Sequence, residues 1–239
     1  MQIDEILKII KQDEIKESIG TKKEKTIHRV IKYLISDDHN NHEVKLSSNI
    51  VDVFLDNQVY EIQTRAFNLL KPKFDHLLDK YPVTVVVPIY SLTYVNKVNQ
   101  DEEIISTRKS PKKDSLYSLG AELYKIKPYL NNPNLSFKII DFTCAEYKYE
   151  RLNKYHRKRL SSLDRIPLVV NEIIDILTPS DWMIKFDLEE PFKRKDFQQH
   201  FHLSERNAIA MLNVLKALDL IEVVAIEKSA YIYKRKETL

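Results

Sequence analysis

The chain has 239 residues, of which 43% are apolar and 31% are charged, and its formal net charge is +3. This composition is typical of a globular protein with one large domain or two small ones, and it is not basic enough by itself to indicate nucleic acid. The absence of a long apolar run and the acidic start of the chain predict no transmembrane helix, no signal peptide and a cytoplasmic location. Two glycines exclude a glycine-rich phosphate loop, and a single cysteine excludes an internal disulfide and a cysteine-built zinc site.

The first part of the chain predicts the order helix, three strands, helix, strand. Apolar residues at helical spacing predict a helix over residues 2–19, and a capping-box pattern at Thr21 and Glu24 begins a second helix that ends near residue 35. Runs with strand patterns follow, then a helical pattern that contains a proline, then a run that is apolar enough for a strand buried on both faces. These segments are 43–46, 50–55, 59–63, 65–81 and 82–90.

The middle of the chain has weaker patterns. Residues 91–110 are consistent with a hairpin, residues 115–130 with a helix, and residues 135–143 with another strand beside the one at 82–90. Residues 146–160 mix basic, acidic and tyrosine side chains, and we expect a charged helix or a connector there.

The last part of the chain predicts a small separate domain. A helix is expected over 166–177, a short strand over 181–186, a short helix near 192–201, and a longer helix capped by Ser204. A hairpin follows, and this order is typical of a winged helix-turn-helix. Arg206 and Asn207 lie early in the expected second helix of that motif, where they can reach a major groove of DNA.

Two acids stand inside the most strand-like segment of the chain. Because strand side chains alternate, pairing of 50–55 with 59–63 lets Asp52 face Glu61. Two facing carboxylates repel each other, and a divalent cation removes that repulsion. Mg²⁺ or Mn²⁺ with carboxylate ligands can polarise a phosphate and activate water, so the pattern predicts a metal site at Asp52 and Glu61.

The arrangement around these acids resembles the PD-(D/E)XK nuclease-like superfamily over roughly residues 20–90. Asp52 matches the motif aspartate, Glu61 and Gln63 match the third-strand pair, and Glu24 matches a helix glutamate that holds metal-bound water in many members. Gln63 departs from the usual lysine. The resemblance therefore implies either a nuclease in which Lys45 or Arg65 supplies the missing cation, or a domain that binds without cleaving.

Basic residues gather in clusters that can neutralise DNA phosphates. A solvated helix face is the alternative interpretation of each cluster. Outside the stretch 148–160, the candidate DNA-binding residues are Arg108, Lys109, Lys112, Lys113, Lys193, Arg194, Lys195, Arg206 and Asn207.

Together these patterns predict an α/β (α+β) protein with a nuclease-like mixed sheet flanked by helices and a C-terminal winged helix. The expected parts are an N-terminal helix (1–19), the nuclease-like domain (20–145), a basic connector (146–165) and the winged helix (166–239). The expected function is metal-dependent hydrolysis of DNA phosphodiester bonds, and cutting both strands would favour a homodimer. The alternatives are an inactive DNA-binding regulator or accessory factor of a mobile element or phage, and a protein-interaction module.

Overall fold

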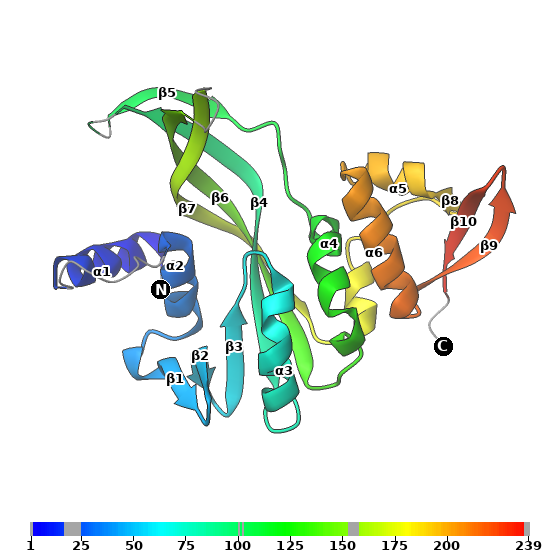
Figure 1. Ribbon diagram of the computed structural model, residues 1–239, viewed down its shortest axis with the longest axis horizontal. Helices are drawn as coiled ribbons and strands as arrows, with labels where there is room; N and C mark the ends of the chain where they lie inside the picture. The colour runs from blue at the N-terminus through cyan, green and yellow to red at the C-terminus, as the bar shows by residue number, and fades with distance from the viewer. Residues whose placement is uncertain (1, 17–24, 100, 102, 153–157, 237–239) are drawn as a thin grey trace.

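The structure, a computed structural model, describes residues 2–16, 25–99, 101, 103–152 and 158–236 and has a mixed α+β fold (Figure 1). In this described part, a seven-stranded sheet has the order β1-β2-β3-β4-β6-β7, with β5 paired to β4, and a second sheet has the order β8-β10-β9. The strands of the large sheet are β1 (His42–Leu46), β2 (Asn49–Leu55), β3 (Gln58–Ile62), β4 (Val83–Val98), β5 (Ile104–Lys109), β6 (Leu135–Leu152) and β7 (Lys158–Ile176).

Helices cover both faces of the large sheet near its centre. On one face, Ile3 of α1 (Ile3–Lys16) and Ile31 of α2 (Thr26–Ile35) pack in the same cluster as Val86 of β4. On the other face, Phe74 of α3 (Lys71–Leu77) packs in the same cluster as Val85. The unbroken apolar run of β4 is therefore explained by burial on both sides. The predicted order of two helices, three strands, helix and strand is confirmed.

A tight turn sets how β2 and β3 pair. Asp56 and Asn57, the two residues between Leu55 and Gln58, have φ values of 51° and 63°. Positive φ at both central residues is the geometry of the two-residue hairpin turn that matches the twist of the strands. The antiparallel register that follows pairs Val53 with Tyr60, and its continuation by one residue sets Asp52 opposite Glu61, as the sequence allows.

Long strands occupy the region where a connector and a helix were expected. β6 runs through residues 146–152 and β7 runs from 158 to 176, while residues 153–157 lie outside the described residues. The predicted connector (146–165) and the predicted helix (166–177) are therefore wrong, and the expected domain boundary falls within a continuous sheet. The β-branched residues of β7 pair along β6, and this long-range ladder overrides the helical spacing.

The C-terminal part contains the expected two helices and hairpin, namely α5 (Arg194–His200), α6 (Glu205–Ala217), β9 (Ile221–Glu227) and β10 (Ala230–Arg235). β8 (Phe192–Lys193) pairs with β10. The strand expected over 181–186 is wrong, because a 3₁₀ helix spans Pro179–Met183 there and buries Trp182 in the core.

The C-terminal helices do not stand apart from the sheet. α4 (Gly120–Leu123), which lies between two 3₁₀ helices, packs against α6 (Figure 1). A Cβ atom on Gly120 would lie 2.6 Å from the Cβ of Met211, so glycine permits this close approach. Met211 and Phe197 belong to the same apolar cluster as Val85 of β4, and one core therefore joins the two parts.

Candidate active site and basic pocket

Asp52 lies at the end of the β2–β3 pairing and is held by two contacts. Its Oδ2 accepts a hydrogen bond from the backbone N–H of Ile62 at 2.7 Å, and its Oδ1 lies 3.3 Å from Nε2 of His28 on α2. Burial raises the pKa of Asp52, but the hydrogen bond and charge of His28 and the Ile62 N–H outweigh it, and the pKa is lowered. Asp52 is therefore an ionised carboxylate near neutral pH.

Glu61 is the more unusual acid because its side chain is only 4% exposed. Nζ of Lys73 lies 2.7 Å from each of its carboxylate oxygens and also donates to the carbonyl oxygen of Ile50 at 2.8 Å. Burial and the nearby charge of Asp52 outweigh Lys73 and raise the pKa of Glu61 to about 7. The site therefore holds two neighbouring acids, and Glu61 is the one that is costly to ionise.

The donor chemistry of this pair fits Mg²⁺ or Mn²⁺. Asp52 and Glu61 offer carboxylate oxygens from neighbouring strands, and the Lys73 ammonium already lies where a metal ion would contact Glu61. Within the described residues, no group of three or more His, Cys, Asp or Glu side chains is arranged to hold a metal. A metal at the pair would thus take its remaining ligands from water and substrate phosphates, as Mg²⁺ often does.

The other predicted catalytic residues do not join the pair. The Gln63 side-chain amide donates to the backbone carbonyls of Arg65 and Ala66 in the loop that follows β3. Lys45 is exposed on β1, where it pairs with Ile50. Glu24 lies outside the described residues, so its predicted role stays a prediction.

Sequence analysis missed Lys73, and it gave no role to His28. Lys73 comes from α3, so it reaches Glu61 through packing of that helix on the sheet and not through a motif spacing. The usable signal was the need of two facing carboxylates for a cation, together with a lysine early in the next helix. A neighbouring ion pair, Lys32 with Glu43 at 2.8 Å, lowers the pKa of Glu43.

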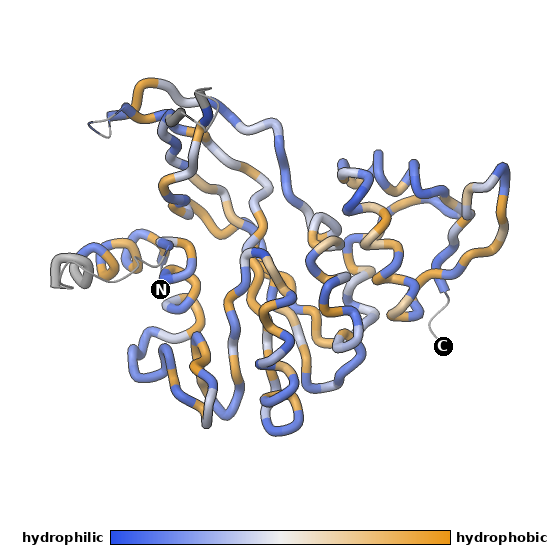
Figure 2. Tube along the Cα trace, viewed as in Figure 1, coloured by the Kyte–Doolittle hydropathy of each residue, from blue (hydrophilic) through white to orange (hydrophobic). Residues whose placement is uncertain are grey.

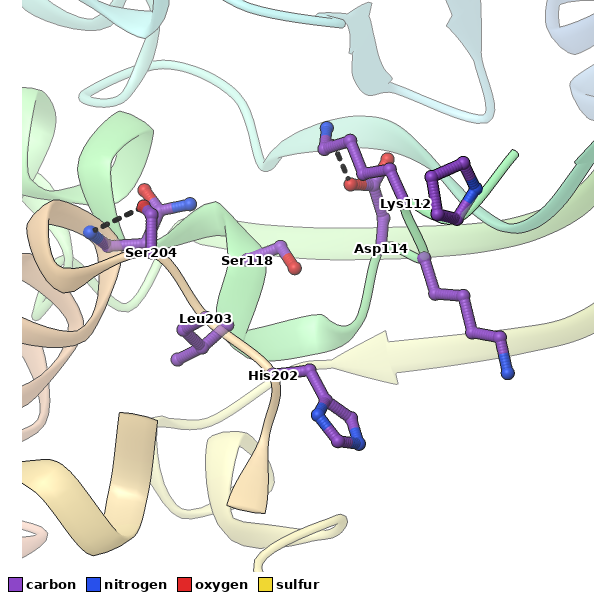
Figure 3. Close-up of a pocket in the computed structure, with 9 residues that line it drawn as sticks. Lys112, Asp114, Ser118, His202, Leu203 and Ser204 are labelled. Atoms are coloured by element: carbon purple, nitrogen blue, oxygen red, sulfur yellow. Dashed lines mark hydrogen bonds and ion pairs between the residues drawn. The ribbon is translucent and has the colours of Figure 1, made fainter. Parts of the chain in front are cut away.

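A second site forms where two of the predicted DNA-binding segments meet. A pocket of about 570 Å³ lies between the segment that follows β5 and the turn before α6 (Figure 3). Ser204 caps α6 by accepting from the N–H of Asn207, and Lys112 pairs with Asp114 at 2.9 Å. The residues that line the pocket are Pro111, Lys112, Lys113, Asp114, Ser118, His202, Leu203, Ser204 and Asn207.

The remaining predicted DNA-binding residues do not line this pocket. Arg108 and Lys109 are exposed at the end of β5. Lys193 pairs with Glu227 at 2.9 Å and Arg194 pairs with Glu205 at 2.5 Å, so acids already offset part of their charge. Lys195 on α5 and Arg206 on α6 are exposed.

Comparisons with known proteins give the family of the chain. An uncharacterized protein of Treponema pallidum (strain Nichols) is 27% identical over 179 residues, which is 74% of this chain and 69% of that protein. No solved structure matches the chain. No helix in the described part is long and apolar enough to cross a membrane. Residues 25–177, more than half of the chain, match a family described as a domain of unknown function (DUF8091), and the protein belongs to this family.

Proposed function

We propose that the protein binds DNA and hydrolyses phosphodiester bonds with a divalent metal at Asp52 and Glu61. The observation that carries this proposal is the buried carboxylate of Glu61. It lies opposite Asp52, and both of its oxygens accept hydrogen bonds from the ammonium group of Lys73. The pKa of Glu61 is raised to about 7, and perturbed pKa values of this kind cluster at functional sites. Its place in the sheet agrees with the resemblance to nuclease-like proteins.

In this proposal each side chain has a defined task. Asp52 and Glu61 would hold Mg²⁺ or Mn²⁺, which polarises the phosphate and activates water when it is bound. The N–H of Ile62 fixes one oxygen of Asp52, and His28 lies beside the other. Lys73 supplies the positive charge that the third-strand position lacks, because Gln63 is uncharged and turned toward its own loop.

DNA would be held through the basic pocket and α6. The segment between β5 and α4 is hydrophilic for most of its length (Figure 2), and it places Lys112 and Lys113 beside the first turn of α6. The N-terminus of a helix favours anions, so phosphates gain from both the lysines and α6. Arg206, exposed on the first turn of α6, is placed for a groove contact if this unit acts as a winged helix.

The experiment that tests the proposal is a cleavage and binding assay on Asp52→Ala. We expect loss of cleavage in Mg²⁺ or Mn²⁺ by about a thousandfold or more, since a metal ligand is removed, while DNA affinity stays within about twofold. Asp52→Asn, which keeps an acceptor for the Ile62 N–H, separates loss of charge from loss of structure. Asp37→Ala, an exposed acid, is the control. Parental cleavage in both Asp52 variants would reject the site.

A DNA-binding protein without cleavage is the second candidate function. Gln63 in place of lysine and the compensation of Glu61 by Lys73 favour it. Salt-dependent DNA binding with no cleavage of single-stranded or duplex DNA in either metal would support it. A homodimer belongs to the nuclease proposal only, because cutting both strands needs two sites, and light scattering with and without duplex DNA tests it.

A further inference from the structure

The ammonium group of Lys73 has an unusually complete set of oxygen partners. Its Nζ lies 2.7 Å from Oε1 and 2.7 Å from Oε2 of Glu61, and 2.8 Å from the carbonyl oxygen of Ile50. A lysine ammonium has three donors, so three oxygens of two neighbouring strands satisfy it. Such a shell of oxygens around one cation is what a small metal ion would also seek.

Both carboxylates of the site already have a basic side chain beside them. Asp52 faces His28, and Glu61 faces Lys73, so each carboxylate has a basic side chain beside it. A divalent cation bound to the Glu61 carboxylate would lie next to the Lys73 ammonium. Two neighbouring cations repel each other strongly in a partly buried site. Lys73 and the metal therefore cannot share Glu61.

Lys73 lies on the solvent side of its ion pair with Glu61. Its side chain is 29% exposed, whereas that of Glu61 is 4% exposed, so the ammonium borders solvent while the carboxylate does not. The lysine stem is flexible, and turning it outward does not require α3 to move.

We propose that Lys73 occupies the divalent-cation position at Glu61 in the free protein and that metal binds there only when Lys73 withdraws. This inference rests on the proposed function, because it uses the same carboxylate pair. An ammonium that leaves Glu61 needs another anionic partner, and a DNA phosphate provides one. Metal and DNA then favour each other's binding, and the free protein stays largely metal-free.

The test is Mn²⁺ calorimetry at pH 8 on the parent, Lys73→Met and Lys73→Arg, with circular dichroism as the check of folding. Lys71→Met, two residues earlier on the same helix, is the matched control. Lys73→Met should bind Mn²⁺ at least about tenfold more tightly than the parent, because a competing charge is gone. Lys73→Arg and Lys71→Met should resemble the parent. A non-cleavable duplex should raise the affinity of the parent far more than that of Lys73→Met.

Thermal melting in the presence of a chelator distinguishes two roles of Lys73. In one role Lys73 competes with Mn²⁺ for Glu61, and in the other it only anchors α3. Lys73→Met should melt below the parent in chelator and recover with Mn²⁺, because the metal then compensates Glu61. If Mn²⁺ gives no recovery and no gain in affinity, Lys73 only anchors α3 and the inference is overturned. Lys73→Gln serves as a second variant if Lys73→Met does not fold.

The outcomes distinguish this inference from the proposed function. Mn²⁺ binding by the parent that Asp52→Asn abolishes and Lys73→Met leaves unchanged would overturn only the inference. Tighter Mn²⁺ binding by Lys73→Met in a protein that cleaves no DNA would support the inference and reject the nuclease. No Mn²⁺ binding by any variant, with or without duplex, would overturn both.

Discussion

The acidic pair and the basic pocket differ in how their charges are held. Glu61 is buried and its partner Lys73 reaches it from another element, so its electrostatics depend on a few fixed contacts. The side chain of Lys112 is 80% exposed, and its ion pair with Asp114 lies within the same short segment. Buried pairs are little screened by salt, whereas exposed lysines act through a field that salt weakens. This difference matches the two roles proposed above, chemistry at the acidic pair and capture of a polyanion at the pocket.

The largest effect is expected from a substitution that disturbs only the pocket side of the molecule. Gly120→Val places a branched side chain where a Cβ would lie 2.6 Å from the Cβ of Met211 and 2.7 Å from the carbonyl oxygen of Asn207. Overpacking of this severity should lower the free energy of unfolding by about 3 kcal/mol and weaken DNA binding, because α4 must move away from α6. Urea denaturation measures the first effect and a binding assay the second.

The control for this change is Ala121→Val, which faces the outer groove between α4 and α6. We expect a change in unfolding free energy of less than about 1 kcal/mol, as is usual for partly exposed sites. Equal losses in the two variants would show that α4 tolerates no added volume anywhere, and the argument from Gly120 would fail.

A substitution at Glu61 should change how the stability of the protein depends on pH. The folded pKa of about 7 lies above the ordinary value of 4.5, so the stability that Glu61 contributes is full below pH 4.5 and is lost as pH rises through 7. The loss is up to about 3 kcal/mol. Glu61→Gln removes the titrating group, and its unfolding free energy should fall less than that of the parent between pH 5 and pH 8 in chelator.

Glu43 provides a contrast with the opposite sign. Its pKa is lowered, first through its hydrogen bond with Lys32, so its contribution to stability is present above the ordinary pKa and is lost as pH falls. Glu43→Gln should therefore leave the difference between pH 5 and pH 8 close to that of the parent. If Glu61→Gln and Glu43→Gln change it equally, the shift assigned to Glu61 is wrong.

The smallest expected effect lies at the pocket lysines. Lys112→Ala with Lys113→Ala should weaken DNA binding about tenfold at low salt and reduce the slope of log affinity against log salt by about two. Lys8→Ala with Lys11→Ala, on the exposed face of α1, removes the same charge elsewhere. A salt slope that falls by the same amount in both double variants would mean that net charge, and not the pocket, attracts DNA.

Local chemistry explains which parts of the fold could be predicted. Asp56 and Asn57 form the turn that sets the register of β2 and β3, and the alternation of strand side chains was enough to expect that Asp52 can face Glu61. The run of β-branched residues near the start of β4 likewise allowed this strand to be predicted. The contribution of Lys73 was not, because it depends on the angle at which α3 packs on the sheet, and no short-range pattern encodes that angle.

The wrong helix prediction at residues 166–177 also reflects long-range packing that no local pattern encodes. Residues 166–177 carry apolar side chains at spacings that suit a helix, but residues 166–176 pair with β6 from Ala145 to Phe137. Pro167 within this stretch is compatible with a strand at the edge of a sheet, a position that β7 occupies. The pocket was foreseen only as two separate basic or polar clusters, since their meeting depends on the packing of α4 against α6.

The packing of α4 on α6 also bears on how this chain can change over evolutionary time. The helices and hairpin at the C-terminal end complete their core with a helix encoded in the middle of the chain, between β5 and β6. A gene segment that carried only residues 178–239 to a new protein would leave Met211 and Leu215 without that cover. The C-terminal helices therefore lack a complete core of their own, even though the family match ends at residue 177.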